Sequence, residues 1–293
     1  MLDFSNSREE ELKWAVANKK GVQTFIKRDD LIHPVVSGNK WRKLHLIFEQ
    51  AIKDKKTEII TFGGAYSNHL LATACAGNMY GIKTRGVVRG EEIKTLNLQL
   101  SLCKRYGMNL TFVSRTEYKD KKSLSEKFTS KNNLVIDEGG RHPLAIEGVR
   151  TIIQELQRQY DYLILPVGTG TTLEGIAEEI KDTNLATGII AFSALKENQE
   201  DKSRLNHLLD IIDWKDETEF GGYGKFNLEL IQFMNDFTKQ TGVLIDPIYQ
   251  GKMYFGLAKL IEGNHFNPGS KILCIQTGGN LGLYTKKVAK LIS

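Results

Sequence analysis

The feature that most constrains this chain is a regular alternation of strand-like and helix-like segments between residues 57 and 137. Short apolar runs, as at 58–62 and 83–88, are each followed by a longer segment with the apolar period of a helix. The pattern resumes at Tyr162–Val167, which is apolar on both faces as a central parallel strand is, and it continues to an expected strand at 272–276. Repeated strand–helix units build parallel sheets covered by helices, so we expect an α/β fold.

A break in this alternation predicts two lobes. The pair Gly139-Gly140 interrupts the pattern before an expected long helix at 144–160, and we place the return from one lobe to the other there. Each lobe is expected to be a mostly parallel sheet with helices on both faces. The larger lobe would comprise residues 1–45 and 144–293, and the smaller lobe residues 46–143.

Composition excludes little but narrows the class. Hydrophobic residues make up 41% and charged residues 26%, and the net charge of +5 is spread along the chain. No apolar run reaches the roughly 18 residues that span a bilayer, and residues 1–20 lack the apolar core of a secretory signal. Cys75, Cys103 and Cys274 have no metal-ligand spacing and read as reduced core thiols. We expect a cytoplasmic enzyme or binding protein with no metal, membrane or nucleic-acid partner.

Lys40 lies in the stretch Ser37–Leu44 (SGNKWRKL), between a flexible approach and the start of a helix expected at 41–53. A lysine amine that is neutral and held in place can form a Schiff base with an aldehyde cofactor. Taken alone, the stretch is more typical of three solvated cations on a surface helix.

Further polar loops follow expected strands, where open α/β sheets bind ligands. The first is Gly63-Gly64-Ala65-Tyr66-Ser67-Asn68-His69. Its two glycines allow close backbone approach, and its last three side chains gather at a helix start. They indicate contacts to a substrate and a cofactor, or alternatively a helix cap with exposed polar neighbours.

The loop Gly168-Thr169-Gly170-Thr171-Thr172 lies between a buried strand and a helix expected from Leu173. Backbone N–H groups and hydroxyls at a helix start suit an anion. The loop lacks the Gly-Lys-Ser/Thr ending of nucleoside-triphosphate sites, and Leu173 replaces the last glycine of the dinucleotide fingerprint. A compact phosphate monoester fits best, and a plain tight turn is the alternative.

Two tyrosines and a last glycine loop complete the set. Tyr223 and Tyr249 lie in loops framed by glycine or proline. Two interpretations are open: the tyrosines are packing residues, or they line a pocket. Gln276–Asn280 follows the last strand and precedes an expected final helix. Alone, this segment is a glycine turn.

Together these motifs resemble the fold-type II pyridoxal-phosphate enzymes. The most similar group contains 1-aminocyclopropane-1-carboxylate deaminase and D-cysteine desulfhydrase. The matching stretches, in chain order, are KRDDL (27–31), SGNKWRKL (37–44), SNH (67–69), GTGTT (168–172), DPIYQGKM (246–253) and TGG (277–279).

The resemblance implies a role for each motif. Lys40 would carry pyridoxal 5'-phosphate and Asn68 would bond its ring hydroxyl. Gly168–Thr172 would hold the phosphate, and Thr277 would face the pyridine nitrogen. Ser67, Tyr223 and Tyr249 would be catalytic with Lys40. The substrate, a small amino acid, would be bound by Ser67, Asn68, His69 and Tyr249, in a protein expected to be a homodimer.

Two positions depart from the deaminase pattern, which has glutamate and leucine where this chain has Gln250 and Thr277. A carboxylate near the pyridine nitrogen keeps that nitrogen protonated and strengthens electron withdrawal, whereas a threonine hydroxyl does not. We therefore expect a lyase that releases keto acid and ammonia by β-elimination, like D-cysteine desulfhydrase. The alternatives are cyclopropane-carboxylate deamination, a catalytically poor cofactor-binding protein and, more distantly, a nucleotide-dependent oxidoreductase.

Overall fold

The chain folds into two compact units. The computed structural model describes residues 3–36, 38–92, 94–195, 199–216, 219–280 and 283. Unit 1 comprises Met1–Ile32 and Arg150–Ser293, and unit 2 comprises His33–Val149. The division differs from the expected lobes, because residues 33–45 and 144–149 group with the smaller unit. The expected final helix lies outside the described residues.

Unit 2 is built on a four-stranded sheet of order β5-β4-β3-β6, with all neighbouring strands parallel. Its strands are β3 (Glu58–Gly64), β4 (Lys83–Arg89), β5 (Asn109–Val113) and β6 (Asn133–Ile136). Its helices are α2 (Asn39–Lys53), α3 (Asn68–Tyr80), α4 (Leu98–Arg105), α5 (Lys121–Phe128) and most of α6 (Pro143–Gln154).

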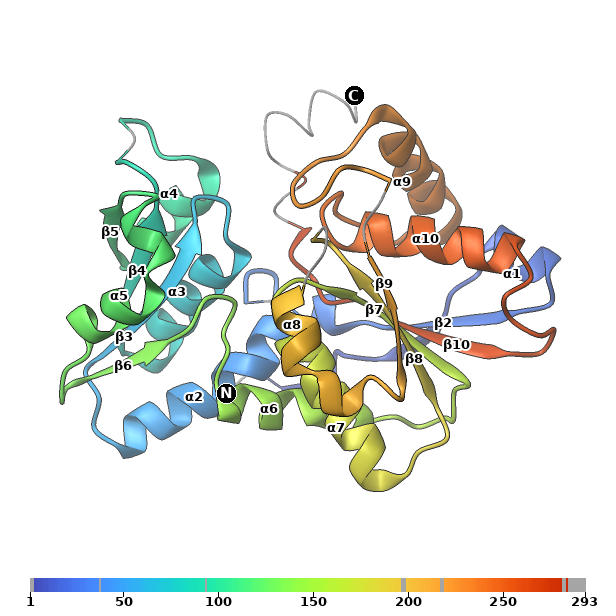
Figure 1. Cartoon of the computed structure of the whole chain (residues 1–293), viewed down its shortest axis with the longest axis horizontal. Helices are drawn as coiled ribbons and strands as arrows, with labels where there is room; N and C mark the ends of the chain where they lie inside the picture. Colours follow the sequence, from blue (N-terminus) through green and yellow to red (C-terminus); the bar gives the residue numbers. More distant parts are fainter. Residues whose placement is uncertain are drawn as a thin grey trace. The chain divides into compact units, whose positions relative to one another are not determined.

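Alternating side chains bury both faces of the unit 2 sheet. Ile60 and Phe62 of β3 pack with Leu124 of α5 in one apolar cluster. On the opposite face, α3 lies so close to β4 that a Cβ at Gly77 would come within 2.3 Å of Thr84 Cγ2. Figure 1 shows α5 and α3 on opposite sides of these strands. The expectation of helices on both faces is confirmed for this unit.

Unit 1 contains a six-stranded sheet of order β1-β2-β10-β7-β8-β9, in which only the β1–β2 pair is antiparallel. Its strands are β1 (Glu9–Glu11), β2 (Gln23–Lys27), β7 (Tyr162–Val167), β8 (Gly188–Ser193), β9 (Ile212–Lys215) and β10 (Lys271–Ile275). Its helices are α1 (Ala15–Lys19), α7 (Thr171–Thr183), α8 (Gln199–Arg204), α9 (Leu228–Thr241) and α10 (Gln250–Glu262).

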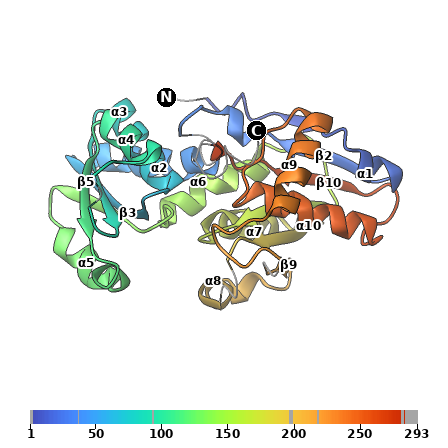
Figure 2. The same ribbon diagram turned by 90° about the horizontal axis from the view of Figure 1, so that it is seen from above.

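An aromatic cluster holds three helices of unit 1 against one face of its sheet. Trp14, next to α1, meets Phe237 of α9 and Tyr254 of α10 edge-on, with ring centroids 5.4 and 5.9 Å apart. Edge-to-face contacts of this kind add to the stabilisation from burial. Helices α9 and α10 lie side by side in Figures 1 and 2, and α7 covers the opposite face of the sheet. This unit therefore also has helices on both faces.

One helix is shorter than expected for a tertiary reason, and one strand is longer than expected. The helix expected at 144–160 ends at Gln154, because Gln157 N and Tyr160 Oη instead donate to the carboxylate of Glu9, at 2.8 and 2.6 Å. Strand β3 continues through the glycine pair that was expected to end it.

In the described part of the chain, no helix combines the length and the apolar content needed to cross a membrane.

Gly148 of α6 is expected to be required for the close packing of α6 against α2. A Cβ at this position would lie 2.0 Å from the backbone oxygen of Arg42, which cannot move without displacing α2. Gly148→Ala should therefore cost about 1–3 kcal/mol of unfolding free energy, although alanine is the better helix former. Urea unfolding measures the loss. Gly64→Ala is the control, because its Cβ would meet Arg89 only at 3.5 Å and should change stability by about 0.5 kcal/mol or less.

Candidate active site

Lys40 is the second residue of α2, and its side chain is mostly withdrawn from water. Gly38 precedes the helix with a φ of 66°, a conformation that glycine adopts without strain. Lys40 Nζ lies 3.5 Å from the backbone oxygen of Gly139, a long hydrogen bond. Burial disfavours the ammonium form and lowers the pKa of Lys40 to about 8. The neutral fraction of this amine near pH 7 is therefore roughly 300-fold larger than for an exposed lysine.

Aromatic stacking fixes the first turn of α2. Trp41 stacks on Tyr80 of α3 with ring centroids 6.0 Å apart, and Phe48 stacks on the same ring at 5.3 Å. Arg42 and Lys43 are buried as well. The alternative of three solvated cations on a surface helix is therefore wrong for this turn, and the backbone that carries Lys40 is held on α3.

Ser67 caps the N-terminus of α3. Its Oγ accepts a hydrogen bond from Leu70 N at 3.3 Å, and Asn68 is the first helical residue. A Cβ at Gly63 would lie 2.6 Å from the Ser67 hydroxyl, so only glycine allows this approach. Because the cap uses the oxygen as an acceptor, the hydroxyl hydrogen of Ser67 stays available to a ligand.

His69 is buried, contrary to the alternative of exposed polar neighbours. Its side chain is 2% exposed, and its Nε2 lies 2.8 Å from Thr61 Oγ1 of β3. The pKa of His69 lies well below the usual value. Burial is the main cause, and the positive charges of Lys40 and Lys43 lower it further. The imidazole is therefore neutral.

Asn97 is a residue of this loop system that the sequence reasoning missed. Its Oδ1 accepts from Leu100 N at 2.9 Å and caps α4, while its Nδ2 donates to Ala65 O at 2.7 Å. The loop before Ser67 is thus tied to the start of a second helix. The available signal was the asparagine itself, because asparagine favours a helix cap over a helix interior.

In unit 1, the glycine–threonine loop joins β7 to α7. Gly170 has a φ of 72° and is the last residue before the helix, which begins at Thr171 rather than at Leu173. Both threonines therefore lie in the first turn, and the Thr171 N–H donates back to Thr169 O at 2.9 Å. Thr171 Oγ1 is buried and has no hydrogen-bond partner among the residues that the structure describes.

Arg204 holds this loop from the outside. Its Nη2 donates to Thr169 O at 3.3 Å, and its Nη1 pairs with the carboxylate of Glu174 in the first turn of α7. No local pattern pointed to Arg204, because the residues it binds are 30 and 35 positions away in sequence.

The two predicted tyrosines come together. Tyr249 Oη lies 3.3 Å from Tyr223 Oη, and Tyr223 is 51% exposed. A Cβ at Gly168 would lie 3.1 Å from the Tyr249 ring, which places the phosphate-loop candidate against this tyrosine. The alternative of core packing is wrong for Tyr223, because half of its surface is open to solvent.

Asp246 organises the backbone around Tyr249. Its buried carboxylate accepts from the backbone N–H of Ile248, Tyr249 and Gln250 at 2.8, 2.9 and 3.1 Å. Burial raises the pKa of Asp246, and these hydrogen bonds act in the opposite direction. Asp246 thus fixes the turn that precedes α10.

Gln250 and Thr277 are hydrogen-bonded to each other. Gln250 Nε2 donates to Ile275 O at 3.2 Å and to Thr277 Oγ1 at 2.9 Å. A backbone oxygen can only accept, so the Ile275 contact fixes which end of the amide faces Thr277. Thr277 must therefore accept from Gln250, and its own hydroxyl hydrogen has no acceptor among the described residues.

Each unit contains groups with the chemistry that an aldehyde phosphate cofactor requires. Lys40 offers an amine that is easily deprotonated, Thr171 a buried hydroxyl at a helix N-terminus, and Thr277 a hydroxyl donor. Among the described residues, no group of three His, Cys, Asp or Glu side chains could hold a metal ion. Lys40, Ser67, Asn68 and His69 belong to unit 2, and the other predicted site residues to unit 1.

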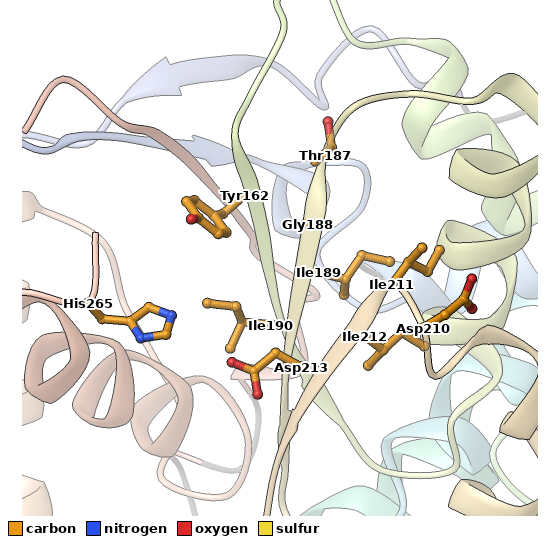
Figure 3. A pocket seen from close by; sticks show the side chains of 10 residues that line it. All are labelled: Tyr162, Thr187, Gly188, Ile189, Ile190, Asp210, Ile211, Ile212, Asp213 and His265. Carbon is orange, nitrogen blue, oxygen red and sulfur yellow. The ribbon is translucent and has the colours of Figure 1, made fainter. Parts of the chain in front are cut away.

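A separate cavity of about 460 Å³ lies at the other end of the unit 1 sheet. Figure 3 shows its lining, which includes the first residues of the parallel strands β7, β8 and β9: Tyr162, Gly188 and Ile212. The glycine–threonine loop follows the last residue of β7, so this cavity is distinct from the candidate site.

Comparisons with known proteins agree on one family. Residues 14–278 match the family described as pyridoxal-phosphate dependent enzymes. A bifunctional D-cysteine desulfhydrase/1-aminocyclopropane-1-carboxylate deaminase of Arabidopsis thaliana is 30% identical, over 91% of this chain and 74% of its own length. A D-cysteine desulfhydrase of Salmonella choleraesuis is 26% identical, over 90% of this chain and 89% of its own.

Solved structures give the same result for the fold. An ACC deaminase homologue has a TM-score of 0.84 and 26% identity, covering 98% of this chain and 94% of that one. A fungal L-serine ammonia-lyase from Rhizomucor miehei shares the fold at a TM-score of 0.70 and 16% identity, covering 94% and 93%. The chain belongs to the pyridoxal-phosphate-dependent enzymes, in the family of the 1-aminocyclopropane-1-carboxylate deaminases and D-cysteine desulfhydrases.

Proposed function

We propose that this enzyme is a lyase that eliminates the β-substituent of a small amino acid, D-cysteine or a close analogue, and does not open a cyclopropane ring. For D-cysteine, the C–S bond breaks, the sulfur leaves as sulfide, and water releases a keto acid and ammonia. The Gln250–Thr277 hydrogen bond is the observation that carries this choice.

The polarity of that hydrogen bond decides how strongly a bound ring can withdraw electrons. Because Gln250 donates to Thr277, the Thr277 hydroxyl can only donate onward, and a pyridine nitrogen beside it would be an unprotonated acceptor. A carboxylate at position 250 would instead favour a protonated nitrogen. Ring opening of a substrate without an α-hydrogen needs the stronger electron sink, whereas elimination of a good leaving group such as thiolate needs it less.

The other residues have separate tasks in this proposal. Pyridoxal phosphate, once bound, acidifies the α-hydrogen of an amino acid. Lys40 is the attachment point, and its amine, with a pKa lowered to about 8, is the base for the α-proton. Ser67 offers its hydroxyl hydrogen to the substrate. Tyr249 donates its hydroxyl hydrogen to Tyr223, which leaves the Tyr223 hydroxyl hydrogen available. Asn68 would bond the ring hydroxyl, and the loop from Gly168 to Thr172 would hold the phosphate.

The cellular setting is part of the same proposal. Cys75, Cys103 and Cys274 are buried free thiols, which suits a reducing cytoplasm. A homodimer is expected, and light scattering of the purified protein tests it. Cyclopropane-carboxylate deamination is the second candidate function, since the name of the Arabidopsis relative includes that activity.

The attachment site can be mapped directly. Borohydride reduction of the purified protein should leave the cofactor on the peptide that contains Lys40, and Lys40→Ala should abolish this adduct. Lys43 is a buried lysine close by, and it is the alternative attachment point. A reduced adduct on the Lys43 side chain, found by mass spectrometry, would contradict the proposal.

Thr171→Val should separate cofactor binding from folding. The Thr171 hydroxyl has no partner to lose, so unfolding of the cofactor-free protein should be unchanged or slightly more difficult. Retention of pyridoxal phosphate should weaken by about tenfold to a hundredfold, the value of one hydrogen bond to a charged group. Absorbance titration measures the affinity, with Thr129→Val as the control. Equal affinities in the two variants would show that the loop is only a turn.

The choice of reaction has its own test. The double substitution Gln250→Glu with Thr277→Leu removes the donor chain and adds a carboxylate. Relative to elimination, ring opening should rise about tenfold to a hundredfold, which corresponds to about 1.4–2.8 kcal/mol of transition-state stabilisation. The measurement is keto acid release from D-cysteine and from 1-aminocyclopropane-1-carboxylate. If the parent enzyme opens the ring as fast as it eliminates sulfide, the second candidate function replaces the first.

A further inference from the structure

The hydrogen bonds of Thr61 fix the proton of His69. Thr61 Oγ1 donates to Ile136 O at 3.0 Å, across the β3–β6 pair, and lies 2.8 Å from His69 Nε2. A hydroxyl has one hydrogen, and a backbone oxygen can only accept. The Thr61 hydrogen therefore points to Ile136, and His69 Nε2 must carry the imidazole hydrogen. This leaves His69 Nδ1 as an unprotonated acceptor.

Nothing in the described chain donates to that acceptor. His69 Nδ1 is buried without a hydrogen-bond partner among the residues that the structure describes. A buried acceptor left unpaired is unfavourable by an amount comparable to a lost hydrogen bond. His69 Nε2 is hydrogen-bonded to Thr61, so the ring is fixed. The unpaired Nδ1 therefore indicates that a neighbouring donor moves to it in another conformation of the site.

The Gly139-Gly140 turn restricts which donor can arrive. A Cβ at Gly140 would lie 3.3 Å from His69 Nδ1 and 3.1 Å from its Cε1, so the turn closely covers this side of the ring. The amines of Lys40 and Lys43 both reach Gly139 O, at 3.5 and 3.4 Å. Because both amines already contact the turn, they are the candidate donors to His69 Nδ1.

Lys40 is the better donor of the two. Lys43 is almost completely buried, whereas the Lys40 side chain is partly exposed and lies at the start of its helix. Its amine can therefore move at little cost.

We propose that His69 is a positioning residue for Lys40: while the amine is not attached to the cofactor, it exchanges between Gly139 O and His69 Nδ1, which accepts its N–H. The proton stays on the amine, and the only change is that one hydrogen bond passes from Gly139 O to Nδ1. The contact would keep the freed amine within the site for its next use. This inference rests on the proposed role of Lys40 as the attachment point.

Nuclear magnetic resonance of histidine-labelled protein tests the contact without any turnover. In long-range ¹H–¹⁵N spectra of the cofactor-free enzyme, His69 should show a protonated Nε2 and an unprotonated Nδ1, with His69→Gln identifying its signals. Lys40→Met should move the Nδ1 resonance to the position of a nitrogen that accepts no hydrogen bond. Lys43→Met should not. A protonated Nδ1, or the shift appearing only with Lys43→Met, overturns the proposal.

A matched pair of substitutions tests the consequence for Lys40. In His69→Asn the amide oxygen can replace Nδ1 as an acceptor, whereas His69→Gln keeps a donor for Thr61 and loses the acceptor. Covalent capture of pyridoxal phosphate by the cofactor-free protein should slow about threefold to tenfold in the Gln variant and less in the Asn variant. Equal rates in the Gln variant and the parent would refute the inference.

A second pair controls for the loss of a buried hydroxyl. Thr61→Val releases the His69 proton from its fixed position, so both the spectrum and the capture rate should change. Thr73→Val removes another buried hydroxyl, one that has no hydrogen-bond partner among the described residues, and should change neither. If the cofactor attaches to a different lysine, the proposed function fails, while the spectra still decide whether Lys40 contacts His69.

Discussion

A lysine amine taken out of water is the constraint on which the site in unit 2 depends. Burial alone lowers the pKa of Lys40 to about 8, with no opposing carboxylate among its causes. This requires a rigid surrounding, because a mobile helix end would let the amine return to solvent. The stacking of Trp41 and Phe48 on Tyr80 and the close approach of Gly148 to Arg42 supply that rigidity.

Backbone carbonyls of strands fix proton positions in both units. Ile275 O orients the Gln250 amide and thereby the Thr277 hydroxyl, and Ile136 O orients Thr61 and thereby His69. In each case a group that cannot donate determines the direction of a short hydrogen-bond chain. The chemistry of the side chains is thus set by the ends of β10 and β6, which the sheets themselves hold in place.

Local pattern predicted most elements because apolar periodicity matches burial over strands such as β7, whose expected bounds, Tyr162–Val167, agree with the structure. It failed where distant contacts decide. The end of α6 depends on Glu9, and the loop before α7 is held by Arg204. Both partners are distant in sequence, so the local sequence around these segments does not reveal the contacts. The site motifs were recognisable because glycine and threonine pairs break the periodicity. The burial of His69 and the pairing of Tyr249 with Tyr223 required the folded chain.

Strand order in unit 1 has a consequence for synthesis on the ribosome. Strand β10, from residues 271–275, lies between β2, from residues 23–27, and β7. The sheet therefore lacks an interior strand until almost all of the chain has emerged. Unit 2 is one continuous segment and can fold earlier. During this interval β2 and β7 expose edges that can pair with other chains, so chaperone dependence should be concentrated in unit 1.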